Sequence, residues 1–209
     1  MGRHLAIHDS DWINGFLFVG NQTALDFLNT RPIQNGEALE LFSDFDAVLR
    51  WFRAAGLLTV GVTHKLQKDW AASGRAAHFL ANLIEFRERL RDAITTWELH
   101  GQAPKSMVAE LNQLLDQHPM RTRLNAGGTG TELWFKALEP EDLFAPLAHS
   151  AAELFSSADH PRVRKCGRCV LHFLDTSKKG TRRWCSMQLC GNRAKVAAYA
   201  SRQRNRRKS

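Results

Sequence analysis

Cys166-Gly167-Arg168-Cys169 and Cys185-Ser186-Met187-Gln188-Leu189-Cys190 contain all four cysteines of this 209-residue chain. Two residues separate the first pair, four separate the second, and fifteen lie between the pairs. Four thiolates spaced in this way are able to surround one tetrahedral zinc ion. We therefore expect one Zn²⁺ per chain, bound by Cys166, Cys169, Cys185 and Cys190.

Four protein ligands complete the coordination sphere of zinc and leave no position for water or substrate, so the expected site is structural. His172 lies close in sequence but is not needed as a ligand. The alternative interpretations of the same cysteines are two disulfides, free thiols, a catalytic zinc ion or an iron–sulfur cluster. A reducing cytosol disfavours the disulfides.

The residues around the cysteines predict a small module resembling a treble clef. We expect a strand over 163–169, then a hairpin whose strands are 170–175 and 181–184, with a turn at 177–180 between them. The composition becomes helical from about Met187, which places Cys190 in the first turn of the last helix.

Charge divides the chain at the same place. Residues 161–209 contain fifteen Lys or Arg and a single acid, Asp175, a net charge of +14. Residues 1–160 carry −6, and the whole chain +8. A mildly acidic body attached to a strongly basic segment is typical of proteins that bind polyanions.

The sequence predicts that the N-terminal part is mostly helical. Apolar residues recur at helical spacing over 73–100 and 105–117, while 121–125 and 131–137 flank a Gly-rich turn and predict a β-hairpin. The predicted fold is α+β: a predominantly helical domain with a small β-hairpin over 1–158, a zinc-binding module over 162–203 and a basic tail over 204–209.

The cysteine segment also resembles a known family. Residues 166–195 are similar to a CGNR zinc finger through Phe173-Leu174-Asp175-Thr176-Ser177, Arg182-Arg183-Trp184-Cys185-Ser186-Met187 and Cys190-Gly191-Asn192-Arg193-Ala194-Lys195. The preceding part resembles the ABATE domain through Phe16–Gly20, Leu25–Thr30, Leu49–Phe52 and Gly56–Leu58. The resemblance implies a stress-induced transcription regulator.

Basic residues around the second cysteine pair are the candidates for nucleic-acid binding. The metal would bring them together, and phosphates are their natural partner. Asn192 either reads an adenine edge or caps a turn, and the structural role is favoured. The basic tail extends the same charge. The expected interface comprises Arg182, Arg183, Asn192, Arg193, Lys195, Arg202 and Arg204, with duplex DNA as the expected partner.

Three polar residues stand in an apolar helix of the N-terminal part: Asp26, Asn29 and Thr30. One interpretation is a pocket for a small-molecule effector, since such pockets place a few polar groups in apolar walls. The other is capping and internal hydrogen bonding to the Val19–Gly20 segment, which is favoured.

The leading hypothesis is a cytoplasmic transcription regulator that is not an enzyme, because no nucleophile–base pair, phosphate-binding loop or HExxH motif occurs. An RNA-binding or ribosome-associated protein is the first alternative, and a small-molecule enzyme with a structural zinc is the second. No apolar run reaches the roughly 20 residues that span a bilayer, so we expect no membrane partner. A homodimer is left open.

Overall fold

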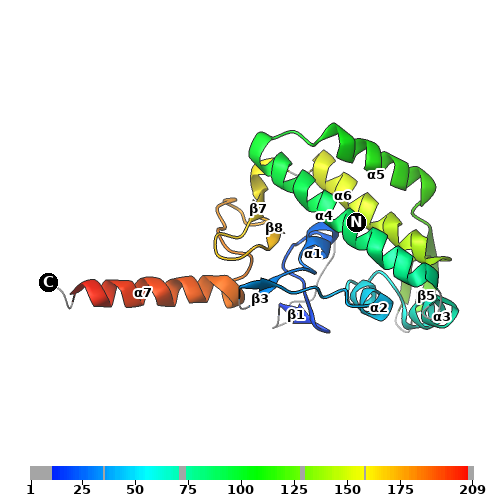
Figure 1. Cartoon of the computed structure of the whole chain (residues 1–209), viewed down its shortest axis with the longest axis horizontal. Coiled ribbons are helices and arrows are strands. Elements are labelled where there is room, and N and C mark those ends of the chain that lie inside the picture. Colours follow the sequence, from blue (N-terminus) through cyan, green and yellow to red (C-terminus); the bar gives the residue numbers. More distant parts are fainter. Residues whose placement is uncertain (1–10, 35, 71–73, 128–129, 158, 207–209) are drawn as a thin grey trace.

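The computed structural model describes residues 11–34, 36–70, 74–127, 130–157 and 159–206. Its body is helical: α1 (Thr23–Leu28), α2 (Phe45–Ala54), α3 (Val60–Trp70), α4 (Gly74–His100), α5 (Lys105–Gln117) and α6 (Phe144–Ser157). Figure 1 shows α4, α5 and α6 running alongside one another, with α1 and α2 beneath them. We call α1–α6 and the segments that connect them the helical body.

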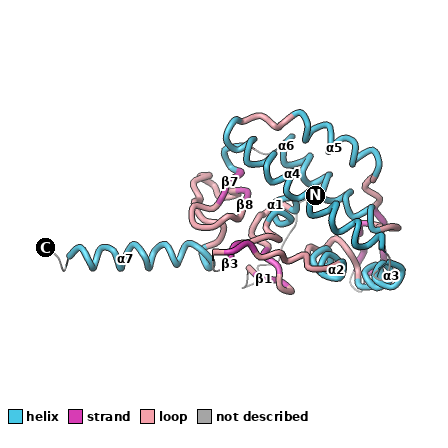
Figure 2. The backbone as a smooth tube through the Cα atoms, viewed as in Figure 1, coloured by secondary structure: helices cyan, strands magenta, loops and turns pink. Residues whose placement is uncertain are grey.

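Short antiparallel strand pairs complete the architecture (Figure 2). The pairs are β1 (Trp12–Ile13) with β2 (Phe16–Leu17), β3 (Ile33–Gln34) with β4 (Glu37–Ala38), β5 (Thr122–Gly127) with β6 (Gly130–Phe135), and β7 (Val163–Lys165) with β8 (His172–Leu174). Single turns at Pro140–Leu143, His160–Arg162 and Met187–Gly191 (η1, η2, η3) precede α6, β7 and α7 (Asn192–Arg206) respectively.

The predicted helices over 73–100 and 105–117 are confirmed as α4 and α5, and the predicted β-hairpin as β5–β6. The α+β class, with a mostly helical N-terminal part and a C-terminal cysteine cluster, is confirmed as well. The two helices were predictable because each buries one face at the helical period. On α4 the buried side chains include Phe79, Leu83, Phe86, Leu90 and Ile94.

Two apolar clusters form the core. The larger joins aromatic side chains of the helical body, with Trp51 within about 6 Å of Phe27 and Phe42, ring centroid to ring centroid. The smaller one surrounds the cysteines and contains Leu171 and Phe173 together with Leu17 and Val19 of the N-terminal segment. The finger, which we define as β7 through η3, therefore completes its core with residues from the start of the chain.

Hydrogen bonds join the same two parts along β8. The side-chain amide of Asn29 donates to the His172 carbonyl and accepts from the His172 N–H, both at 2.9 Å. The Leu174 N–H donates to the Gly20 carbonyl at 2.8 Å, and the Asn21 amide donates to the Leu174 carbonyl at 2.9 Å. We call these five residues the docking seam.

Gly20 allows this approach. A Cβ at this position would lie 2.7 Å from the Asp26 nitrogen and 2.8 Å from the Leu25 Cβ, closer than real atoms come. The Gly20 N–H donates to the Asp26 carboxylate at 2.7 Å, while its carbonyl receives β8. The residue thus holds α1 on one side and the finger on the other.

The finger differs from the predicted hairpin. The predicted return strand over 181–184 is wrong, because β8 pairs with β7 and residues 176–186 form a loop. Side chains satisfy the backbone of this loop in place of a strand partner. The buried Asp175 carboxylate accepts from the N–H groups of Ser177 and Arg182, at 2.9 and 2.7 Å. The Arg164 guanidinium donates to the Gly180 carbonyl at 2.9 Å.

Replacing Asn29 tests the docking seam. Asn29→Ala leaves the buried N–H and C=O of His172 without partners, and each such group costs about 1–3 kcal/mol. We expect the free energy of unfolding to fall by about 3 kcal/mol in urea denaturation. Asn112→Ala, at an exposed position of α5, is the control and should change it by less than about 0.5 kcal/mol. A loss below about 1 kcal/mol for Asn29→Ala would contradict the seam's importance.

Candidate metal centre and basic surface

The four cysteines converge on one point. Their Sγ atoms all lie within 4.8 Å of one another, and Cys166, Cys185 and Cys190 are buried. The Sγ atoms of Cys169 and Cys185 are 3.7 Å apart. Zinc–sulfur bonds of about 2.3 Å place tetrahedral ligands roughly 3.8 Å apart, whereas a disulfide requires about 2.05 Å. The arrangement fits one structural zinc ion per chain, as predicted.

The protonation of the cluster favours the same conclusion. Hydrogen bonds from Cys169 and Cys185 lower the pKa of the Cys166 thiol, and the hydrogen bond to Cys166 raises the pKa of Cys169 to about 12. Hydrogen bonding to Cys166 and Cys169, together with burial, raises the pKa of Cys185 as well. Four thiolates this close together repel one another, and a bound dication would offset that repulsion.

Local hydrogen bonds position the second cysteine pair. Ser186 caps η3, its hydroxyl accepting from the N–H groups of Gln188 and Leu189 at 3.0 and 3.2 Å. The same hydroxyl donates to the Asp11 carboxylate, which gives a further contact between the finger and the start of the chain. Cys190 lies inside η3 and α7 begins two residues later, close to the predicted helix position.

Arg182 points inward. Its guanidinium donates to the carbonyls of Trp184, at 2.8 Å, and Cys185, and lies 4.8 Å from the centre of the Phe173 ring. The half-buried side chain therefore holds the loop that carries Cys185. Its predicted contact with nucleic acid remains untested, and these bonds occupy the group that would make that contact.

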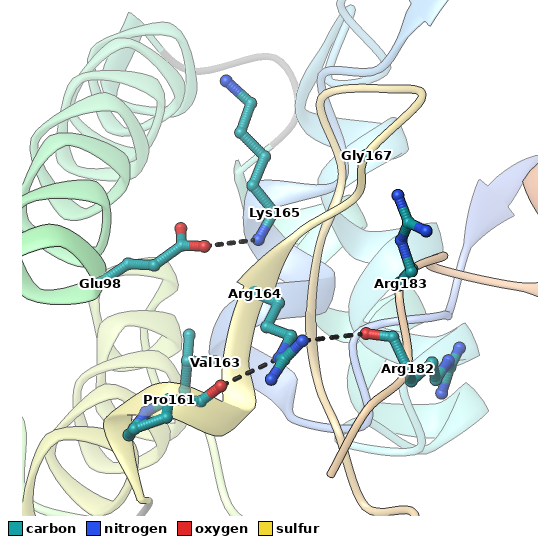
Figure 3. A pocket seen from close by; sticks show the side chains of 8 residues that line it. All are labelled: Glu98, Pro161, Val163, Arg164, Lys165, Gly167, Arg182 and Arg183. Atoms are coloured by element: carbon teal, nitrogen blue, oxygen red, sulfur yellow. Dashed lines mark hydrogen bonds between the residues drawn. The ribbon is translucent and has the colours of Figure 1, made fainter.

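Other basic side chains border a shallow groove of about 380 Å³ between α4 and the finger (Figure 3). Lys165 and Arg183 are exposed, and their charged ends make no hydrogen bond or ion pair with any described residue. Figure 3 shows them on either side of the Gly167 turn. Glu98, the one acid of the groove, accepts from the Lys165 N–H at 3.1 Å, which fixes α4 against β7.

The last helix bears the remaining candidates. α7 is 15 residues long and extends away from the helical body (Figure 1). Asn192, Arg193 and Lys195 are exposed at its start, and Val196 and Tyr199 are 68% and 58% exposed. The side chains of Arg202 and Arg204 lie outside the described part, although α7 includes both residues.

Asp26, Asn29 and Thr30 are buried and bonded to protein groups. Asp26 accepts from Gly20, and Asn29 pairs with His172, as described above. The Thr30 hydroxyl donates to the Phe27 carbonyl at 2.7 Å and accepts from Arg87 at 2.9 Å. The Asp26–Gly20 bond matches the predicted internal bonding, while an effector pocket at these residues stays an untested prediction.

Two features were missed from the sequence. Lys165 was not predicted at the basic surface, and Leu17 was not assigned to the core of the finger. Strand alternation would place Lys165 on the same face as the buried Val163, so the pattern of β7 did not indicate that Lys165 is exposed. Nothing local to Leu17 indicates that it meets the cysteines, because about 150 residues separate them.

His172 is buried within the docking seam and is not part of the cysteine cluster. Burial, with the charges of Arg91 and Lys165, lowers its pKa to about 4, so the imidazole is neutral near pH 7. Its backbone rather than its ring makes the contacts to Asn29.

Removal of one ligand tests the metal centre. We expect Cys190→Ser to lose zinc, and β7, β8 and η3 to lose amide hydrogen-exchange protection together with the Leu17–Val19 segment they cover. α4 and α5 should keep theirs, because their core lies in the larger cluster. Lys178→Gln, on the exposed part of the finger loop, is the control and should retain one zinc per chain. Full zinc retention by Cys190→Ser would refute the ligand assignment.

Comparison with known protein families finds matches in two parts of the chain. None of the described helices is long and apolar enough to cross a membrane. No curated protein matches the chain. Residues 162–203 match the CGNR zinc finger, and residues 21–158 match the family described as "ABATE: Putative stress-induced transcription regulator". The chain therefore belongs to the ABATE family and contains a CGNR zinc finger.

Proposed function

We propose that this protein is a transcription regulator that binds duplex DNA through α7 and the adjoining basic groove. The observation that carries the proposal is α7 itself, a helix of 15 residues that extends from the molecule and contains no acidic residue. At 1.5 Å per residue it is about 22 Å long, and an α-helix of this kind fits the major groove.

The exposed side chains at the start of α7 suit that placement. Arg193 and Lys195 would contact phosphates or guanine edges, while Val196 and Tyr199 offer apolar surface for thymine methyl groups. Lys165 and Arg183 would contact the flanking backbone. The zinc ion takes no part in the chemistry; it fixes η3 and so the origin of α7.

The helical body is then the part that governs binding. A role in the stress response and action in the cytoplasm belong to the same proposal, the first supported by the description of the matched family. Effector binding by the helical body also belongs to it. The absence of a reactive nucleophile–base pair in the sequence supports a regulator rather than an enzyme.

Salt dependence of DNA binding tests the interface. Each lost phosphate contact should reduce the slope of log K against log salt by about 1. We expect the double variant Arg183→Gln with Lys195→Gln to reduce the slope by about 2 while keeping its zinc. Arg50→Gln, exposed on α2, removes a matched charge far from α7 and should leave the slope unchanged. The measurement uses a pool of random duplexes, with structured RNA as competitor.

Three outcomes would count against the proposal. An unchanged slope in the double variant would remove these residues from the interface. Preferential binding of structured RNA would favour the ribosome-associated alternative. Absence of binding to either polymer at about 50 mM salt, with zinc fully loaded, would reject nucleic-acid binding altogether.

Arg182 is expected to behave differently from Arg183. Because its guanidinium is bonded to the carbonyls of Trp184 and Cys185, Arg182→Gln should weaken the zinc loop. We expect faster zinc release to a chelator, by about tenfold, whereas Arg183→Gln should release zinc at the wild-type rate. Equal release rates for the two variants would show that the inward bonds of Arg182 do not stabilise the loop.

A further inference from the structure

A second hollow, of about 300 Å³, lies where the helical body meets the finger. Its walls come from four separate segments: the β1–β2 hairpin, the start of β3, the first cysteine turn and the base of α7. This volume falls at the lower end of the range for small-molecule sites. It is separate from the groove of Figure 3 and contains none of Asp26, Asn29 and Thr30.

The walls are mainly apolar. Leu17 and Leu171 are buried at the base, while Trp12 and Ile33 remain 43% and 48% exposed. Leu189 closes the side towards α7. Large apolar side chains that stay exposed around a concave site are covered by ligands in many proteins, and an indole suits the flat face of an aromatic ring.

The charges around the hollow indicate which charge a bound ligand should carry. Among the described residues of the lining, Arg193 is the one that carries a charge, and its side chain makes no hydrogen bond or ion pair with any of the described residues. It stands in the first turn of α7, directly after η3. Cys169 and Cys190 also line the hollow, and four thiolates around Zn²⁺ carry a formal charge of −2.

An anion is therefore repelled from the cysteine side and attracted at Arg193. A ligand that satisfies both conditions has an uncharged flat body and one anionic group at its end. We propose that this hollow binds a small aromatic carboxylate, with the ring against Trp12 and Ile33 and the carboxylate on Arg193.

Such a ligand would contact the start of the chain, β3 and the base of α7 at once. It would stabilise the arrangement of α7 relative to the helical body, because ligands stabilise the conformation they bind. An effect on DNA binding rests on the proposed function, whereas binding of the carboxylate itself does not.

Two probes of equal shape test the site: 2-naphthoate and its uncharged amide, 2-naphthamide. Isothermal titration of the full-length, zinc-loaded protein should give one saturable naphthoate site per chain, with a Kd in the millimolar range or tighter. The amide should bind about tenfold more weakly. Arg193→Gln should abolish this preference for the acid and leave amide binding unchanged.

Blocking the apolar wall gives an independent test. Ile33→Trp should remove binding of both probes, whereas Val60→Trp, at an exposed position of α3 outside the hollow, should change neither. Lys178→Gln is the matched charge control for Arg193→Gln and should keep the preference for the acid. Circular dichroism and zinc content verify that each variant is folded.

Three results would overturn the proposal: no saturable naphthoate binding to the wild-type chain, an unchanged acid preference in Arg193→Gln, or an equal loss in Lys178→Gln. DNA binding, measured separately without probe, distinguishes this failure from failure of the proposed function. Saturable naphthoate binding by a protein that does not bind DNA would reject only the proposed function.

Discussion

The pairing of the Asn29 amide with the backbone of His172 determines how the two parts of this protein are arranged. One side chain supplies both the acceptor and the donor that a neighbouring strand would offer to β8. Gly20 extends the same edge by accepting from Leu174. Because Asn29 and His172 are buried, separation of the finger would leave their polar groups without partners at considerable cost. The finger is thus an extension of the helical body rather than a module on a free linker.

This docking gives the zinc ion a role beyond the finger itself. The thiolates share a core with Leu17 and Val19, and Ser186 bonds to Asp11. Metal binding is therefore expected to order residues 11–19 against the finger as well. Arginines divide accordingly: Arg164 and Arg182 satisfy carbonyls of the cysteine loop, while Arg183 and Arg193 remain exposed. Sequence proximity to cysteine does not by itself distinguish these two uses.

The sequence was informative wherever the determining contacts are local. The cysteine spacing predicted the ligands, and the helical period predicted α4 and α5. The prediction of a strand failed at residues 181–184. There the side chains of Asp175 and Arg164, and not a neighbouring strand, form the hydrogen bonds to the backbone of the loop. The partner of Asn29 could not be derived either, since 143 residues separate it from His172. Contacts of that kind depend on the tertiary arrangement, which periodicity does not report.

The position of the second hollow connects these observations. It is bounded by the segments that meet at the finger, and Arg193 belongs both to its wall and to the first turn of α7. A group that occupies Arg193 there competes with any phosphate for the same cation. The docking seam is too well bonded for the finger to detach readily, so regulation by large domain movement is disfavoured. Competition and small changes at the base of α7 are the routes by which a ligand in this hollow would alter the proposed DNA contacts.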